Sequence, residues 1–240
     1  MHRGLACLLL AGAVGASHVT VGGVISHTDD QYICVNLDWW PHNKCDYGTC
    51  AWKYDSMLNI NLSHPLLLAA VKGLSPKPVL RLGGSLCDMV TYNITLPDNA
   101  RATAAAPPLS CQPFELDNSL RVGFKGGCLS MERWLSLHAF AEAAGADVIF
   151  GINALRGRHL ASPCPAGTDC RNASVETAPS CCTNWTGSWD SSNAEALLAF
   201  TAKSGLRLAG VEFGNELVGE QGIESHLAPE VYSADFQRFA

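Results

Sequence analysis

Charge is scarce in this sequence of 240 residues. Asp, Glu, Lys and Arg make up 16% of it and apolar residues 48%, whereas soluble domains usually carry roughly 25% charged residues. Disordered chains combine low hydrophobicity with high charge, so this composition indicates a folded core. The formal net charge is −6, and no run of Lys or Arg exceeds two residues. Both features speak against a nucleic-acid-binding or anionic-membrane-binding surface.

Long apolar runs are also missing, and the N-terminus carries a short one. Arg3 precedes an apolar stretch at residues 5–14, and the small residues Gly15 and Ala16 follow it. A membrane-spanning helix needs about 20 apolar residues, so the stretch is too short to span a bilayer. Its flanks are typical of a secretory signal peptide, which we expect at residues 1–16. A buried N-terminal segment is the alternative.

Metal-binding spacings are absent as well. The sequence has no CxxC pair and no cluster of histidines, so its eleven cysteines do not form a zinc motif, and we expect no metal or cofactor. Ten cysteines remain after the signal peptide, an even number that indicates disulfide bonds in an exported protein. Four acceptor sequons for N-glycosylation favour the same compartment: Asn61, Asn93, Asn172 and Asn184.

Short apolar runs alternate with longer segments of helical periodicity. We expect strands at residues 32–37, 78–82, 147–152 and 208–213, and helices at 66–73, 131–144 and 193–203, with another beginning at Pro229. This alternation predicts an α/β fold in which helices cover a parallel sheet. Residues 93–127 and 156–191 interrupt the alternation as inserts.

A catalytic motif follows the last expected strand, which runs into Gly214-Asn215-Glu216. In a (β/α)8 barrel, catalytic side chains lie at the carboxyl ends of the strands. A carboxylic acid beside an amide suits glycoside cleavage, because the acid protonates the leaving oxygen while the amide binds the sugar's 2-hydroxyl. An Asn-Glu turn with solvated side chains is the alternative.

Six sequence blocks stand in a distinctive order: CVNLDWWPHNKCDYGTC (34–50), VLRLGGSLCD (79–88), GCLSMERW (127–134), VIFGINALRGR (148–158), SSNAEALLAF (191–200) and VEFGNEL (211–217). They resemble the plant heparanase-like proteins of glycoside hydrolase family 79, from about residue 31 to the end of the chain, apart from the two inserts. The resemblance implies a retaining β-glucuronidase with a (β/α)8 TIM-type barrel and an appended β-sandwich. Its substrates would be glycans or proteoglycans that contain glucuronic acid.

The resemblance also assigns roles to individual residues. Glu216 becomes the general acid/base (the proton donor), and Asn215 holds the sugar near its 2-hydroxyl. Asp38 and Ser85 match positions that contact the glucuronide, although Ser85 stands where relatives often have Thr. Asn153, in the loop after the third strand, is a further substrate-binding candidate.

Arg81 has two interpretations. At the end of the second strand it could pair with a catalytic carboxylate from a later strand, or it could form an ion pair with Glu212 inside the barrel. Asp38 and Ser85 could likewise cap the turns in which they lie.

Only four of the eight βα units of a barrel are recognisable. We therefore expect residues 17–240 to be the N-terminal half of a barrel, with the β-sandwich and the second carboxylate outside this chain. That carboxylate, the nucleophile, lies about 5–5.5 Å from the acid in retaining enzymes. The chain alone is then expected to be inactive.

Two other functions stay open. One is a secreted, non-catalytic carbohydrate-binding protein that keeps the fold, and the other is a barrel glycosidase with a different sugar specificity. For all three we expect a secreted protein, extracellular or in the cell wall. A lysosome- or vacuole-like compartment, and a peripheral association with membrane or wall, are left open.

Overall fold

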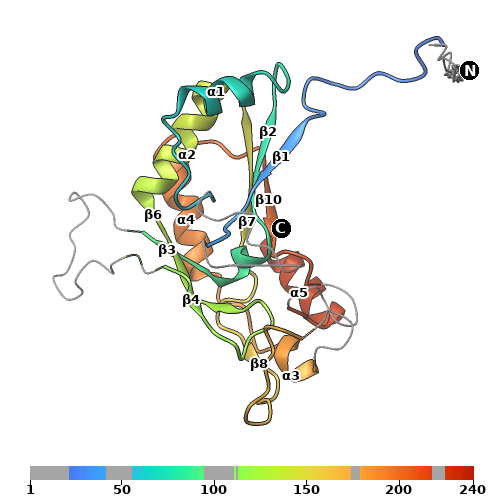
Figure 1. Ribbon diagram of the computed structural model, residues 1–240, viewed down its shortest axis with the longest axis vertical. Coiled ribbons are helices and arrows are strands. Elements are labelled where there is room, and N and C mark those ends of the chain that lie inside the picture. The colour runs from blue at the N-terminus through green and yellow to red at the C-terminus, as the bar shows by residue number, and fades with distance from the viewer. Residues whose placement is uncertain (1–21, 42–55, 95–110, 112, 174–178, 218–224) are drawn as a thin grey trace, which may run out of the picture.

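A parallel sheet forms the centre of the computed structural model, which describes residues 22–41, 56–94, 111, 113–173, 179–217 and 225–240. Its four strands lie in the order β1 (Cys34–Leu37), β2 (Val79–Leu82), β7 (Asp147–Ile152) and β10 (Gly210–Phe213). Every neighbouring pair is parallel, which confirms the expected α/β architecture. Because the strands are parallel, all four carboxyl ends lie at the same edge (Figure 1).

Helices α1 (Pro65–Lys72), α2 (Met131–Ala144) and α4 (Ser192–Lys203) lie along one side of this sheet (Figure 1). The Ser130 hydroxyl caps α2 by accepting a hydrogen bond from the Arg133 amide, and Gly145 ends the helix at φ 70°. Trp134 of α2 is fully buried, with its ring centroid 4.7 Å from that of Phe150 in β7. The core therefore lies between the helices and the sheet.

Helix α5 (Pro229–Phe239) packs near the end of β10. The Tyr232 hydroxyl donates to the Phe213 carbonyl at 2.9 Å, and the ring of Phe239 stacks on that of Phe213. A partly buried ion pair joins Asp235 of α5 to Arg158, which follows β7. These contacts attach α5 to the carboxyl edge of the sheet.

The two inserts and the loops beside them fold into short elements that the sequence did not predict. They are the 3₁₀ helix η1 (Ser85–Met89), the parallel pair β3 (Val90–Asn93) and β6 (Gly127–Ser130), the antiparallel pairs β4 (Glu115–Leu116) with β5 (Phe124–Lys125) and β8 (His159–Leu160) with β9 (Trp185–Thr186), and the short helix α3 (Ser180–Thr183). Strands of two residues, such as β4, β5, β8 and β9, are too short to show a periodicity in the sequence, so only the tertiary structure reveals them and their partners.

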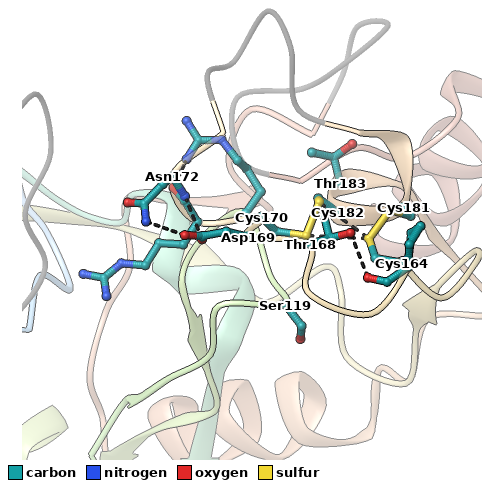
Figure 2. The surroundings of a disulfide bond; sticks show 12 residues. Ser119, Cys164, Thr168, Asp169, Cys170, Asn172, Cys181, Cys182 and Thr183 are labelled. Atoms are coloured by element: carbon teal, nitrogen blue, oxygen red, sulfur yellow. Dashed lines mark hydrogen bonds between the residues drawn. A yellow bond between two sulfur atoms is a disulfide. The ribbon is translucent and has the colours of Figure 1, made fainter.

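Among the described residues, three disulfides hold the inserts: Cys111–Cys128, Cys164–Cys181 and Cys170–Cys182. Figure 2 shows the last two beside each other. The sulfur of Cys164 lies 3.6 Å from those of Cys170 and Cys182. All of these sulfurs are consumed in disulfides, so the cluster offers no thiolate to a metal.

The expectation of disulfides is confirmed for these six cysteines but not for all ten. Cys34 is exposed and unpaired, and Cys87 is buried and unpaired. The Cys87 side chain packs against the backbone of β7, because a Cβ atom built on Gly151 would lie 3.3 Å from its sulfur. Cys45 and Cys50 lie outside the described residues, as does the expected signal peptide. No helix within the described part of the chain is long and apolar enough to cross a membrane.

Candidate active site

Polar side chains from three strands meet at the carboxyl edge of the sheet, and Arg81 is at their centre. Its Nε donates to both carboxylate oxygens of Glu212, at 2.9 and 2.8 Å. Its Nη1 donates to the Asn36 side-chain oxygen at 3.0 Å, and its Nη2 to that of Asn215 at 2.9 Å. The hydrogen bond with Glu212 raises the pKa of Arg81 above its usual value. The pairing of Arg81 with Glu212, one of its two expected interpretations, is confirmed.

This network decides which way the Asn215 amide faces. Arginine carries only donors, so the Asn215 atom that meets it must be the oxygen. The NH2 group is then turned the other way, 3.2 Å from the Glu216 carboxylate and 3.5 Å from the Ser85 hydroxyl. Asn215, Glu216 and Ser85 are therefore brought together by the fold.

The backbone turn that carries this pair is left-handed. Gly214 has φ 71°, and a Cβ atom there would lie 2.5 Å from the Leu217 side chain, so only glycine fits. Glu216 has φ 55°, and within the described part of the chain it is the only residue other than glycine with a positive φ. Such a conformation costs of order 1 kcal/mol and is concentrated at functional sites. The buried Leu217 side chain anchors the turn while Glu216 stays exposed.

A carboxylate that the sequence analysis missed lies beneath this turn. Asp88, in η1, is 3% exposed. One oxygen accepts from the Ala154 amide at 2.8 Å and the other from the Asn215 amide at 2.9 Å. Burial raises the pKa of Asp88 to about 7, and the two amide donors oppose that rise. An acid that closes the largely apolar block VLRLGGSLCD was the signal available.

Asp38 and the Gly83-Gly84 turn lie against each other. One Asp38 oxygen accepts from the Trp39 amide at 2.6 Å, a contact with the next residue in the chain. A Cβ atom on Gly84 would lie 2.1 Å from the other oxygen, so the glycine permits this close approach. Trp39 itself is fully buried and anchors the loop. A contact between Asp38 and a sugar stays a prediction.

Asn153 is not brought together with the other candidates. Its side chain is turned inward, where Nδ2 donates to the Val90 carbonyl at 2.9 Å and Oδ1 accepts from the Leu155 amide at 2.9 Å. It is 7% exposed, and its own amide donates to the Tyr92 hydroxyl. These bonds tie the loop after β7 to β3, so the structure supports a structural role for Asn153. Its contact with a substrate stays a prediction.

The four sequons differ in exposure. Asn61 and Asn172 are exposed, whereas Asn93 and Asn184 are half-buried. The Asn61 side-chain oxygen accepts from both the amide and the hydroxyl of Ser63, at 3.1 and 2.7 Å. Glycosylation of any of them stays a prediction.

Comparison with known proteins agrees with a glycosidase site at this edge of the sheet. The model of glycosyl hydrolase family 79, N-terminal domain, matches residues 15–240. The chain belongs to this family. The expected resemblance is thereby confirmed, and the family implies that the parallel sheet is part of a TIM barrel; the four strands described do not themselves close one.

Curated relatives within the family are longer than this chain. Heparanase-like protein 1 from Arabidopsis thaliana is 37% identical over 239 residues, which cover 96% of this chain and 38% of the relative. Heparanase-like protein 3 from the same plant is 37% identical, over 86% of this chain and 33% of the relative. Baicalin-beta-D-glucuronidase from Scutellaria baicalensis is 30% identical, over 96% and 41%. The chain thus spans about two fifths of the length of these family 79 proteins or less.

Proposed function

We propose that this chain supplies the acid/base site of a retaining β-glucuronidase that hydrolyses O-glycosidic bonds in glycans or proteoglycans containing glucuronic acid. The observation that carries the proposal is the pair Asn215 and Glu216: an exposed carboxyl group next to an amide whose NH2 group is aimed by Arg81. Membership of family 79 and similarity to a protein named as a β-D-glucuronidase support the choice of sugar.

In the proposed mechanism Glu216 acts twice. It first donates its proton to the leaving oxygen while a carboxylate nucleophile attacks the anomeric carbon and the glycosidic bond breaks. As a carboxylate, it then takes a proton from the water that attacks the glycosyl-enzyme and releases the sugar. The Asn215 NH2 group donates to the 2-hydroxyl, and Asp38 and Ser85 lie at the same edge to contact the glucuronide. The nucleophile is expected from a segment outside this chain.

The test is a chimera in which this chain replaces the matching segment of heparanase-like protein 1. We expect the chimera to hydrolyse an aryl β-glucuronide, with retention of the anomeric configuration, at least about tenfold faster than the corresponding β-glucoside and β-galactoside. The chain alone, purified to homogeneity, should give no turnover because it lacks the nucleophile.

Each other outcome points to a different function. A faster rate on the glucoside or galactoside would identify a barrel glycosidase with another sugar specificity. A folded chimera that binds glucuronide-containing glycans without turnover would identify a carbohydrate-binding protein. Turnover by the chain alone would contradict the assignment of the nucleophile to another segment.

A further inference from the structure

The Asp88 carboxylate joins three loops at the carboxyl edge of the sheet. It belongs to η1, which follows β2, and its two oxygens accept from the Ala154 amide after β7 and the Asn215 amide after β10. These residues are 66 and 127 positions away in the sequence. One side chain therefore links the ends of three strands of the sheet.

Burial of a carboxylate is a costly way to make such a link. A charge removed from water is destabilising unless hydrogen bonds replace its solvation, and burial accordingly raises the pKa of Asp88 to about 7. A carboxylate nevertheless has a property that no neutral side chain of the same size has: both of its ends accept. Asparagine, the nearest isostere, would turn an NH2 group toward one of the two amides.

The backbone N–H of Asn215 is the group through which a hydrogen bond can fix the turn at residues 214–216. It lies between Gly214 at φ 71° and Glu216 at φ 55°, so both neighbouring residues have left-handed backbones. Arg81 holds the Asn215 side chain, and Asp88 holds its main chain. Release of the amide would let Glu216 return to a right-handed conformation, which L-residues prefer and which would move its carboxyl group.

We propose that Asp88 is a positioning residue for the acid/base reaction, which it serves by holding the Asn215 amide and thereby the turn that aims Glu216. The inference rests on the proposed function of Glu216 as the proton donor. Displacements of about 1 Å at a reacting group can lower a rate roughly a hundredfold, so a residue without contact to the substrate can control turnover in this way.

The kinetic test uses Asp88→Asn in the chimera with two β-glucuronides. The first has an alkyl leaving group, which needs protonation, and the second an aryl leaving group with a strongly electron-withdrawing ring, which needs little. We expect kcat/KM, which reports the first step, to fall by about tenfold or more on the alkyl substrate and by less than about threefold on the aryl one, because only the alkyl group needs protonation to leave. The ratio of the two rates does not depend on how much of the variant is folded.

Leu86→Ala is the matched control. Leu86 lies in the same 3₁₀ helix and is 1% exposed, but its side chain is apolar and accepts no hydrogen bond. Its truncation should lower thermal stability and reduce both rates by the same factor. If Asp88→Asn also left the ratio of the rates unchanged, the positioning role would be refuted and Asp88 would be a structural residue.

A second measurement needs neither a variant nor turnover. In the unmodified chain, the NMR shifts of the Asn215 amide and of the Asp88 carboxyl carbon should titrate together with a midpoint near pH 7. Within the described part of the chain, the other titratable groups that act on Asp88 or feel its charge are Cys87, Tyr92 and Tyr232. Burial raises the pKa of each above its usual value, away from this window.

The outcomes separate the two proposals. An Asn215 amide that does not respond when Asp88 titrates would overturn the inference, whatever the activity of the chimera. An inactive unmodified chimera would instead count against the proposed function, and the titration would still decide whether Asp88 holds Asn215.

Discussion

At the scale of single residues, the arrangement of the proposed acid/base site follows from groups that can make only one kind of contact. Arg81 can only donate, so it turns the Asn215 oxygen toward itself and the NH2 group toward Glu216 and Ser85. Gly214 and Gly84 have no Cβ, so Leu217 and Asp38 can approach their backbones closely. Glu216 has a left-handed backbone in the turn that follows Gly214.

Glu216→Gln in the chimera tests the proton donor. The amide keeps the size and most hydrogen bonds of the carboxyl group but transfers no proton, so kcat on an alkyl glucuronide should fall by about 10²- to 10⁴-fold. Activated aryl glucuronides should lose less in the first step, and azide should partly restore turnover because it replaces water without needing a base. Glu142→Gln removes an exposed carboxylate of α2 and serves as the control. Near-normal turnover by Glu216→Gln would refute the assignment, and Glu212 would be tested next.

His138 gives a prediction of acid sensitivity. Its ring is 6% exposed and lies edge-on against Trp134, with ring centroids 4.4 Å apart. Burial lowers the pKa of His138 from 6.5 to about 4. Between these values the unfolded chain binds a proton that the folded chain does not, so stability is full above pH 6.5 and falls as the pH drops toward 4.

We expect this group to lower the free energy of unfolding by about 2 kcal/mol across that range, after allowance for partial screening. Denaturant unfolding of the wild-type chain and of His138→Gln, at several pH values, measures it. The difference between the two free energies should change with pH, and parallel curves would show that His138 is not the group responsible.

At the scale of the elements, two helices end at a glycine for different reasons. Gly145 follows α2 at φ 70°, where an L-residue is strained although there is space for a Cβ atom. Gly73 follows α1 at φ −79°, which any residue adopts, and a Cβ atom there would make ordinary contacts with the Ala69 and Ala70 carbonyl oxygens. Glycine is therefore required by the backbone conformation at Gly145, whereas another residue would be accommodated at Gly73.

The two glycines form a matched pair of substitutions. Gly145→Ala should destabilise the protein by about 1 kcal/mol, because alanine resists the left-handed conformation. Gly73→Ala should be neutral or stabilising by up to about 0.5 kcal/mol, because it restricts the unfolded chain without strain. Thermal and denaturant unfolding measure both changes, and equal effects of the two substitutions would contradict this account.

At the scale of the whole molecule, disulfides and sequons suggest an oxidising compartment. Six cysteines are paired in the described residues, and two of the disulfides lie beside each other in the second insert (Figure 2). Disulfides persist mainly outside the cytosol. We therefore propose that the protein is exported and glycosylated, and that it acts outside the cell or in the cell wall.

Expression in a eukaryotic secretory host tests this proposal. The secreted chain should begin near Ser17, and its apparent mass should fall when an endoglycosidase removes N-linked glycans. Asn61→Gln removes a sequon on the surface and should lower the mass by one glycan, whereas Asn59→Gln, which lies outside any sequon, should not. An intact N-terminus together with an unchanged mass would count against export.

Local sequence determined the elements that carry a clear period. The helix at residues 131–144 and the strand at 147–152 match α2 and β7 residue for residue, because capping by Ser130 and Gly145 and a continuous apolar run are properties of neighbours in the chain. The apolar run at residues 208–213 likewise placed Asn215 and Glu216 after a strand, where the structure has them, and the family resemblance came from short ordered blocks.

Only the tertiary structure decided what holds that pair. The partners of Asp88 and Arg81 are 127 and 134 residues away at Asn215, distances over which no local pattern constrains contact. Asn153 lies in a loop after a strand, as expected, yet its side chain bonds to Val90 and Leu155 because the packing of β3 against this loop leaves buried backbone groups to satisfy. Residue types in the sequence can therefore predict which residues belong to a site. The direction of each side chain follows from long-range hydrogen bonds, which form only when the strands come together.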